Sequence, residues 1–224
     1  MDNQARANFL HDLNIEQKRI ALRNLPYVLA YLALTAAPYI YFDIFLWGQD
    51  SLYFLAAFLG WAMGYVLLLF IMQRSGYFAD GKESGVGVYF ALGLSTGILI
   101  ALALVVLILP GLYLLMRWLP VYARALTTEE WITQSMRWSW TATEPFQKPL
   151  AAALAGPVLF YGISLTAIYF YDAMGLSYEA SVIIVHCAES VASAWLLILG
   201  VAAFGLLSET GHRRQELPDG AKPA

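Results

Sequence analysis

Three ionisable side chains interrupt otherwise apolar stretches of this 224-residue chain: Arg117, His186 and Glu189. An ionisable group inside a membrane is costly unless it is paired, which makes each of them a functional candidate. His186 and Glu189 are three residues apart, so a helix would place them on one face. We expect Arg117 and Glu189 to neutralise each other across a helix pair, with His186 nearby. The pair could be structural, could border a polar cavity for an anionic lipid or substrate, or could be absent if Arg117 snorkels to the cytoplasmic interface.

Other kinds of reactive site have little support in the sequence. Cys187 is the only cysteine, so an internal disulfide and cysteine-based metal motifs are excluded. A bis-histidine haem lacks a second ligand, because His186 is the only histidine within an apolar stretch. The catalytic patterns GxSxG and HExxH and a glycine-rich phosphate loop are all missing. We therefore expect no enzyme activity, no metal and no cofactor.

The composition is typical of an integral membrane protein. Hydrophobic residues make up 60% of the chain and charged residues only 13%, and lipid rather than a soluble core can accommodate that much apolar surface. The formal net charge is −3 and no basic patch stands out, which argues against a nucleic-acid partner. The first 24 residues are polar, so we expect insertion to begin with the first membrane helix rather than with a cleaved signal peptide.

Five apolar runs are each long enough to cross a hydrocarbon core of about 30 Å. They cover residues 25–47, 51–73, 88–116, 149–171 and 180–207. Five crossings would place the 117–148 segment and the C-terminal tail outside, although both are rich in cations that normally stay in the cytoplasm.

A turn at Pro110-Gly111 resolves this conflict. Residues 111–126 would then form a short fourth membrane helix of about 24 Å, although Pro120 should kink it or end it early. Twelve of the 13 Lys and Arg residues would then share the cytoplasmic side: Arg6, Lys18, Arg19, Arg23, Arg74, Lys82, Arg124, Arg137, Lys148, Arg213, Arg214 and Lys222.

The predicted fold is therefore an all-α, polytopic membrane helix bundle with six transmembrane helices, of which the fourth is short and follows the Pro-Gly hairpin. Residues 1–24 form a cytoplasmic amphipathic segment and residues 25–207 the membrane domain. Residues 208–224 form a disordered cytoplasmic tail, which is polar and contains Gly and Pro. Both termini are expected in the cytoplasm.

Two cytoplasmic segments have the pattern of interfacial amphipathic helices. Phe9, Leu13 and Ile20 recur at helical spacing among charged residues. A second helix is expected near 127–143, with Thr127 and Glu130 forming a capping box at its start. The residues around it that we expect at lipid headgroups, as anchors or as anionic-lipid contacts, are Arg124, Arg137, Lys148, Trp131, Trp138 and Trp140.

Two pairs of glycines lie one turn apart in the second and third runs, Gly60 with Gly64 and Gly93 with Gly97. Small residues at this spacing allow helix backbones to approach closely. We expect intramolecular packing there, with homo-oligomerisation as the alternative.

The segment from Leu109 to Lys148 resembles the glycerophosphoryl diester phosphodiesterase membrane domain family and related uncharacterised bacterial inner-membrane proteins. Pro110 and Gly111 match the family's turn, and Arg117 matches its basic residue. The Ser-Trp-x-x-Thr core is matched by Ser139, Trp140 and Thr143. Ser135 and Met136 depart from the usual Ala and Leu.

The resemblance implies the fold and a bacterial inner-membrane location, because the namesake enzymes carry catalysis on a separate soluble domain that we do not expect here. The leading expectation is a non-enzymatic structural, assembly or membrane-homeostasis component, with membrane lipids as partners. The alternative is a transporter or lipid-binding protein with a polar cavity around Arg117, His186 and Glu189.

Overall fold

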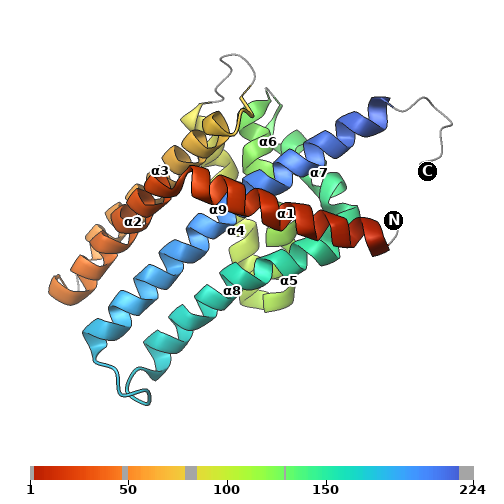
Figure 1. The fold of residues 1–224 in the computed structure, drawn as a ribbon. Coiled ribbons are helices and arrows are strands. Elements are labelled where there is room, and N and C mark those ends of the chain that lie inside the picture. The colour runs from red at the N-terminus through yellow and green to blue at the C-terminus, as the bar shows by residue number, and fades with distance from the viewer. Residues whose placement is uncertain (1–2, 47–49, 79–84, 129, 217–224) are drawn as a thin grey trace. The chain divides into compact units, whose positions relative to one another are not determined.

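The computed structural model describes residues 3–46, 50–78, 85–128 and 130–216, and most of these residues are helical, with no strand among them. The helices are α1 (Asn3–Arg23), α2 (Leu25–Phe45), α3 (Asp50–Arg74), α4 (Val86–Val106), α5 (Ile108–Arg117), α6 (Val121–Thr127), α7 (Ile132–Thr143), the short 3-10 helix η1 (Glu144–Phe146), α8 (Gln147–Phe170) and α9 (Tyr178–Glu216) (Figure 1).

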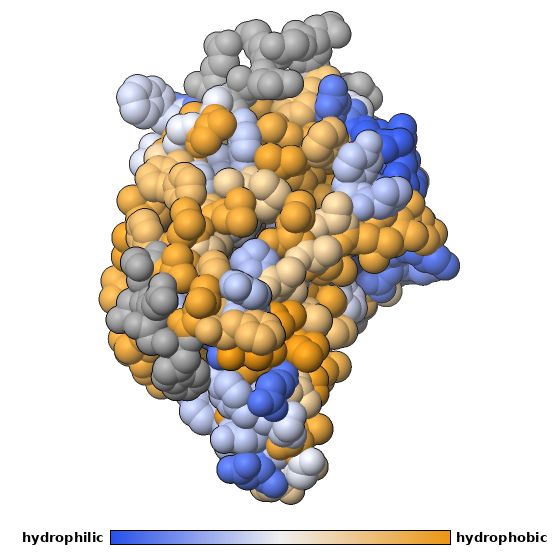
Figure 2. All heavy atoms as spheres, turned by 90° about the vertical axis from the view of Figure 1, so that its left-hand side faces the viewer, coloured by the Kyte–Doolittle hydropathy of each residue, from blue (hydrophilic) through white to orange (hydrophobic). Residues whose placement is uncertain are grey.

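Five helical stretches among the described residues are long and apolar enough to cross a membrane. They cover Leu25–Phe45, Leu52–Arg74, Val86–Val106, Ile132–Phe170 and Tyr178–Ser208. Hydrophobic side chains also dominate the face drawn in Figure 2. Large apolar side chains are strongly exposed on these helices, for example Phe54 at 78% and Tyr169 at 75%. Exposing so many apolar side chains to water is energetically unfavourable, whereas lipid acyl chains solvate them.

The chain forms two compact units. Unit 1 consists of residues 1–17, 77–150 and 199–224, and unit 2 consists of residues 18–76 and 151–198. Unit 2 is built from two helical hairpins, α2 with α3 and α8 with α9. In the first hairpin Tyr27 at the start of α2 stacks on Phe70 near the end of α3, with ring centroids 4.7 Å apart. In the second hairpin, a Cβ atom at Gly156 would lie 2.5 Å from the Trp195 ring, so glycine allows the two helices to pack closely.

In unit 1 the chain reverses direction between α4 and α5. Leu107 takes an extended conformation, with φ −157° and ψ 132°, and separates the two helices. The predicted corner at Pro110-Gly111 is therefore wrong by three residues. Pro110 instead lies in the first turn of α5, where a missing N–H is tolerated. Gly111 packs against α4, because a Cβ there would lie 2.3 Å from Leu104 Cγ and 2.9 Å from the Leu104 backbone nitrogen.

The predicted single helix over residues 111–126 is also wrong. α5 has 10 residues and ends at Arg117, and α6 has 7 residues and begins at Val121. Pro120 lies directly before α6, so the expectation that it interrupts the helix is confirmed. Neither α5 nor α6 alone is long enough to cross a membrane, since 10 residues rise only about 15 Å.

Together, α5 and α6 return along α4 towards the end at which α4 began. Gly111 lies against Leu104 near the C-terminal end of α4. Further along the chain, Val121 and Ala125 of α6 pack with Leu92 of α4 in a buried cluster. Leu92 and Leu104 are twelve residues apart, which corresponds to about 18 Å along a helix.

The segment before α7 differs from the predicted capping box. Thr127 is the last residue of α6, and its hydroxyl donates to the Ala123 carbonyl at 3.0 Å. α7 begins at Ile132, and the Trp131 backbone N–H donates to the Gln134 side-chain oxygen at 3.1 Å. The side-chain contact to the backbone at the start of α7 therefore comes from Gln134, four residues after the predicted Glu130.

The two ends of the chain also extend the helical structure. In α1 the apolar face expected from the spacing is buried, with Phe9, Leu13 and Ile20 exposed by 6%, 0% and 2%. Phe9 stacks on Phe146, with ring centroids 4.1 Å apart. α9 continues to Glu216, so the tail predicted to be disordered from residue 208 is helical that far, and residues 217–224 lie outside the described part.

Candidate functional site

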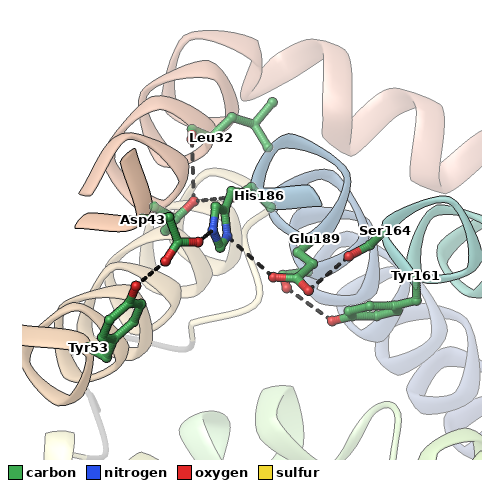
Figure 3. A network of polar contacts seen from close by, with 10 residues as sticks. Leu32, Asp43, Tyr53, Tyr161, Ser164, His186 and Glu189 are labelled. Atoms are coloured by element: carbon green, nitrogen blue, oxygen red, sulfur yellow. Dashed lines mark hydrogen bonds and ion pairs between the residues drawn. The ribbon is translucent and has the colours of Figure 1, made fainter. Parts of the chain in front are cut away.

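His186 of α9 lies between two carboxylates in unit 2. Its Nε2 is 2.6 Å from Asp43 Oδ2 of α2, and its Nδ1 is 3.7 Å from Glu189 Oε2. The predicted common face of His186 and Glu189 is therefore confirmed, because residues three apart on a helix are neighbours. Figure 3 shows the imidazole ring placed between the two acidic side chains. This arrangement suits a protonated imidazole, which donates from both nitrogens, or a neutral one whose Nε2–H donates to Asp43.

Two further hydroxyl groups hold the outer sides of the carboxylates (Figure 3). The Tyr53 hydroxyl of α3 donates to Asp43 Oδ1, and Ser164 Oγ of α8 donates to Glu189 Oε1 at 3.0 Å. The chain of contacts therefore links α2, α3, α8 and α9. Polar groups that are fully hydrogen-bonded inside an apolar structure fix the relative position of the elements that carry them.

A second layer of hydroxyl groups lies one turn further along the same helices. Thr35 Oγ1 of α2 donates to the Tyr31 carbonyl at 2.8 Å and lies 3.0 Å from Ser190 Oγ. Tyr161 of α8 shares a hydrogen bond of 3.2 Å with Ser193. These hydroxyls are therefore occupied with one another, and neither serine is hydrogen-bonded to His186.

A cavity of about 260 Å³ lies beside this network. Helices α2, α3, α8 and α9 all contribute to its lining, which consists of Tyr31, Thr35, Tyr39, Ala57, Gly60, Tyr161, His186, Glu189, Ser190 and Ser193. The Glu189 side chain is 46% exposed, against 12% for His186 and 19% for Asp43. Glu189 is thus the accessible carboxylate. It lies eleven residues after the start of α9, roughly 16 Å along the helix axis.

Aromatic rings form much of the cavity wall. The Tyr39 ring stacks on the His186 imidazole, with ring centroids 5.2 Å apart and an angle of 17° between the planes. Gly60 also borders the cavity, and a Cβ there would meet no described atom within 4 Å. The predicted close helix approach within the chain is therefore wrong at Gly60 and at Gly97, and the homo-oligomer alternative stays a prediction. The missing side chain at Gly60 leaves space in the cavity instead.

Arg117 lies in unit 1, whereas Glu189 lies in unit 2, and the predicted pairing between them stays a prediction. Arg117 is 1% exposed. Its guanidinium carbon lies 4.3 Å from the centre of the Trp140 ring and 5.9 Å from that of Tyr113. Within the described part of the chain, its Nε and Nη1 atoms have no hydrogen-bond partner. The stacking on Trp140 stabilises the charge through a cation–π interaction.

The residues of the Ser-Trp-x-x-Thr pattern meet at Arg117. Ser139 Oγ donates to the Arg117 carbonyl at 2.6 Å, and Thr143 Oγ1 lies 3.4 Å from the same oxygen. Ser135, Ser139 and Thr143 are all fully buried, so this small polar face of α7 packs against protein. Together with the Trp140 ring, it fixes the end of α5. The sequence did not predict this contact between α7 and Arg117.

Some of the side chains predicted to contact lipid headgroups are exposed, and others interact with protein groups. Trp131 is 79% exposed and Arg137 and Lys148 are also exposed. Arg124 instead forms an ion pair with Glu130, at 2.5 Å, and its guanidinium lies 5.0 Å from the centre of the Trp138 ring.

Asp43, Tyr39 and Thr35 were missed as members of the site, although the sequence carries a signal for them. Tyr31, Thr35, Tyr39 and Asp43 follow one another at intervals of four residues along an apolar helix. Such a stripe lies on one helix face. The partner helix shows the same pattern in His186, Glu189, Ser190 and Ser193. Read together, two polar stripes on apolar helices indicate a shared polar interior.

No protein-family model, curated protein or solved structure gives a match to this chain.

Proposed function

We propose that this chain is a multi-pass membrane protein that binds a small polar solute in the unit 2 cavity, as the binding step of a transporter or carrier. The cavity of about 260 Å³, with Glu189 and His186 in its wall, carries the proposal. A structural or assembly role would have been favoured by a closely packed apolar interior. Binding sites at mid-membrane depth, lined by polar groups between helices, are typical of transporters. Arg117 is not part of this cavity lining.

The proposed topology has six crossings, with both termini in the cytoplasm of a bacterial cell and the protein in its inner membrane. The return of α5 and α6 along α4 supports an even number of crossings, because it brings the chain back towards the side from which α4 began. Asp43 and His186 join the C-terminal end of α2 to the first half of α9, so the α2–α3 and α8–α9 turns lie at one end of unit 2. A reporter fused to the C-terminus tests the orientation, and a periplasmic signal would contradict it.

The family resemblance is compatible with this proposal and remains an expectation. The residues that carry it, Pro110 to Thr143, lie in unit 1, and the cavity lies in unit 2. We therefore propose that unit 1 provides a shared membrane fold and that the cavity of unit 2 provides the binding. No bond-making step belongs to the proposal.

Filling the cavity tests the proposed function. Gly60→Leu adds a side chain where a Cβ meets no described atom within 4 Å, so the new atoms can enter the cavity without a backbone clash. Gly162→Leu is the matched control, since Gly162 is exposed on α8 and has the same free space around its Cβ. Purified wild type and both variants would be heated in lipid nanodiscs with a panel of small cations, anions and neutral polar solutes.

At least one solute should raise the melting temperature of the wild type and of Gly162→Leu but not that of Gly60→Leu. A ligand at 100 times its Kd stabilises a protein by about 2.7 kcal/mol. The proposal fails if no solute in the panel stabilises the wild type, or if Gly60→Leu responds as the wild type does.

A further inference from the structure

We infer that the unit 2 cavity selects a small organic ammonium ion. This inference rests on the proposed function and names the class of solute that the cavity would take.

The charge of the cavity wall is the first argument. Glu189 and His186 lie in the cavity wall, and Asp43, which is outside the lining, contacts the other nitrogen of His186. The three groups together carry two negative charges when the imidazole is neutral and one when it is protonated. No Lys or Arg is among the lining residues. A negative charge without a counter-charge is costly in a low-dielectric environment and is compensated by a cation. An anionic solute would find no positive partner on this wall apart from a protonated His186, which already contacts both carboxylates.

The accessible carboxylate is placed to contact a bound cation. Glu189 is 46% exposed, although Ser164 and His186 hold the carboxylate in place. A cation at Glu189 would therefore meet an already oriented charge and would not need to remove a protein partner. Preorganised groups of this kind increase affinity because little ordering is required on binding.

The aromatic wall favours an organic cation over an inorganic ion. Tyr31, Tyr39 and Tyr161 line the cavity, and aromatic rings attract ammonium groups through the cation–π interaction. The Thr35, Ser190 and Ser193 hydroxyls line it too and provide oxygen acceptors for N–H or O–H groups. Within the described residues, no group of three or more His, Cys, Asp or Glu side chains is placed to hold a metal ion.

The size of the cavity limits the solute. A volume of about 260 Å³ corresponds to roughly nine water molecules at about 30 Å³ each. It lies just below the range of about 300–1,000 Å³ found for drug-sized ligands. A small amine or quaternary ammonium compound fits, whereas a whole phospholipid does not.

Choline and 3,3-dimethyl-1-butanol provide the direct test, because they share one shape and only choline is charged. Tetramethylammonium and butylammonium would be measured beside them, with acetate as the anion. Binding to the full-length protein in nanodiscs would be followed by isothermal titration calorimetry. We expect at least one of the three ammonium ions to bind the wild type, and choline to bind at least about tenfold more tightly than its neutral analogue, a difference of about 1.4 kcal/mol.

Two variants test the carboxylate. Glu189→Gln keeps the size of the side chain and should weaken ammonium binding at least about tenfold. Glu179→Gln, in the first turn of the same helix and outside the cavity lining, should bind as the wild type does. Ammonium affinity within twofold of the wild type in Glu189→Gln would overturn the inference.

A second pair of variants keeps the test decisive if Glu189→Gln does not fold. Tyr161→Phe retains the ring and should keep ammonium affinity within about threefold, whereas Tyr161→Leu should lose about tenfold, since cation–π contacts require the ring. Equal ammonium affinity of Tyr161→Phe and Tyr161→Leu would contradict the inference.

The two proposals fail in different ways. If a neutral or anionic solute binds as well as the ammonium ions and Gly60→Leu abolishes its binding, the cavity is a solute site and only its selectivity for cations is refuted. If Gly60→Leu leaves all binding unchanged, the proposed function itself is refuted.

Discussion

Gly111→Ala should open the α4–α5 hairpin, and the structure allows the size of the effect to be worked out. The added Cβ would lie 2.3 Å from Leu104 Cγ, 2.4 Å from Leu104 Cδ2 and 2.9 Å from the Leu104 backbone nitrogen. The leucine side chain can rotate away, but the backbone nitrogen can move only if α4 and α5 separate. Overpacking of this kind costs about 1–3 kcal/mol. Alanine also stabilises a helix relative to glycine by about 0.5–1 kcal/mol, so the net loss should be smaller than the clash alone.

Gly97→Ala is the matched control for this prediction. Gly97 lies in α4, it is exposed, and its Cβ would meet no described atom within 4 Å. This variant gains the helix-propensity term without a clash, so the difference between the two variants isolates the clash at about 1–3 kcal/mol.

The assay is equilibrium unfolding of both variants in mixed micelles by SDS titration, followed by tryptophan fluorescence. Gly111→Ala should unfold at a lower SDS fraction than the wild type, and Gly97→Ala at an equal or higher one. If Gly111→Ala is as stable as Gly97→Ala, the tight hairpin and the return of α5 along α4 are refuted.

Three further substitutions test the contacts around Arg117 and α9 by the same unfolding measurement. Ser139→Ala removes a fully buried donor to the Arg117 carbonyl and should lower the free energy of unfolding by about 1–2 kcal/mol. The exposed control Thr141→Ala should change it by less than about 0.5 kcal/mol. Equal effects of the two variants would show that α7 does not hold α5. Trp140→Leu should destabilise the protein more than Trp131→Leu by about 0.5–2 kcal/mol, because of the two tryptophans only Trp140 lies against the Arg117 guanidinium. A larger loss of stability in Trp131→Leu would contradict the stabilising contact between Trp140 and Arg117. Gly200→Ala would place a Cβ 2.7 Å from the Leu119 carbonyl oxygen and should lower the free energy of unfolding by about 1–3 kcal/mol. Unchanged stability would mean that α9 can move away from the turn before α6.

Local sequence features predicted the helices well and the connections less well. Each of the five predicted apolar runs begins within a few residues of the start of an observed helix, because an apolar run of that length is helical in lipid. The corner of the α4–α5 hairpin was misplaced at Pro110-Gly111. Proline and glycine permit a turn but do not require one, and close packing of Gly111 on Leu104 determined where the chain reverses. The break before α6 was predictable, since Pro120 has no N–H for a continuous helix.

In the candidate site, too, some residues were predicted from local sequence and others were not. His186 and Glu189 stood out because they are ionisable residues in an apolar run, and their common helix face follows from the spacing alone. Asp43 was missed, although it is the closest partner of His186. The two residues are 143 positions apart in the sequence, so helical spacing cannot relate them.

The sequence by itself determined a helical membrane protein with a few ionisable groups in apolar stretches, because hydropathy and helical period are properties of neighbouring residues. Only the tertiary structure decided which of those groups meet. It placed Asp43, His186 and Glu189 in one chain of contacts beside a cavity. It also placed the Arg117 guanidinium against Trp140 and the Arg117 carbonyl against the Ser139 hydroxyl of α7. Pairing between distant helices depends on how their faces pack. The spacing of residues within one helix shows that it has a polar face but not which residues that face meets.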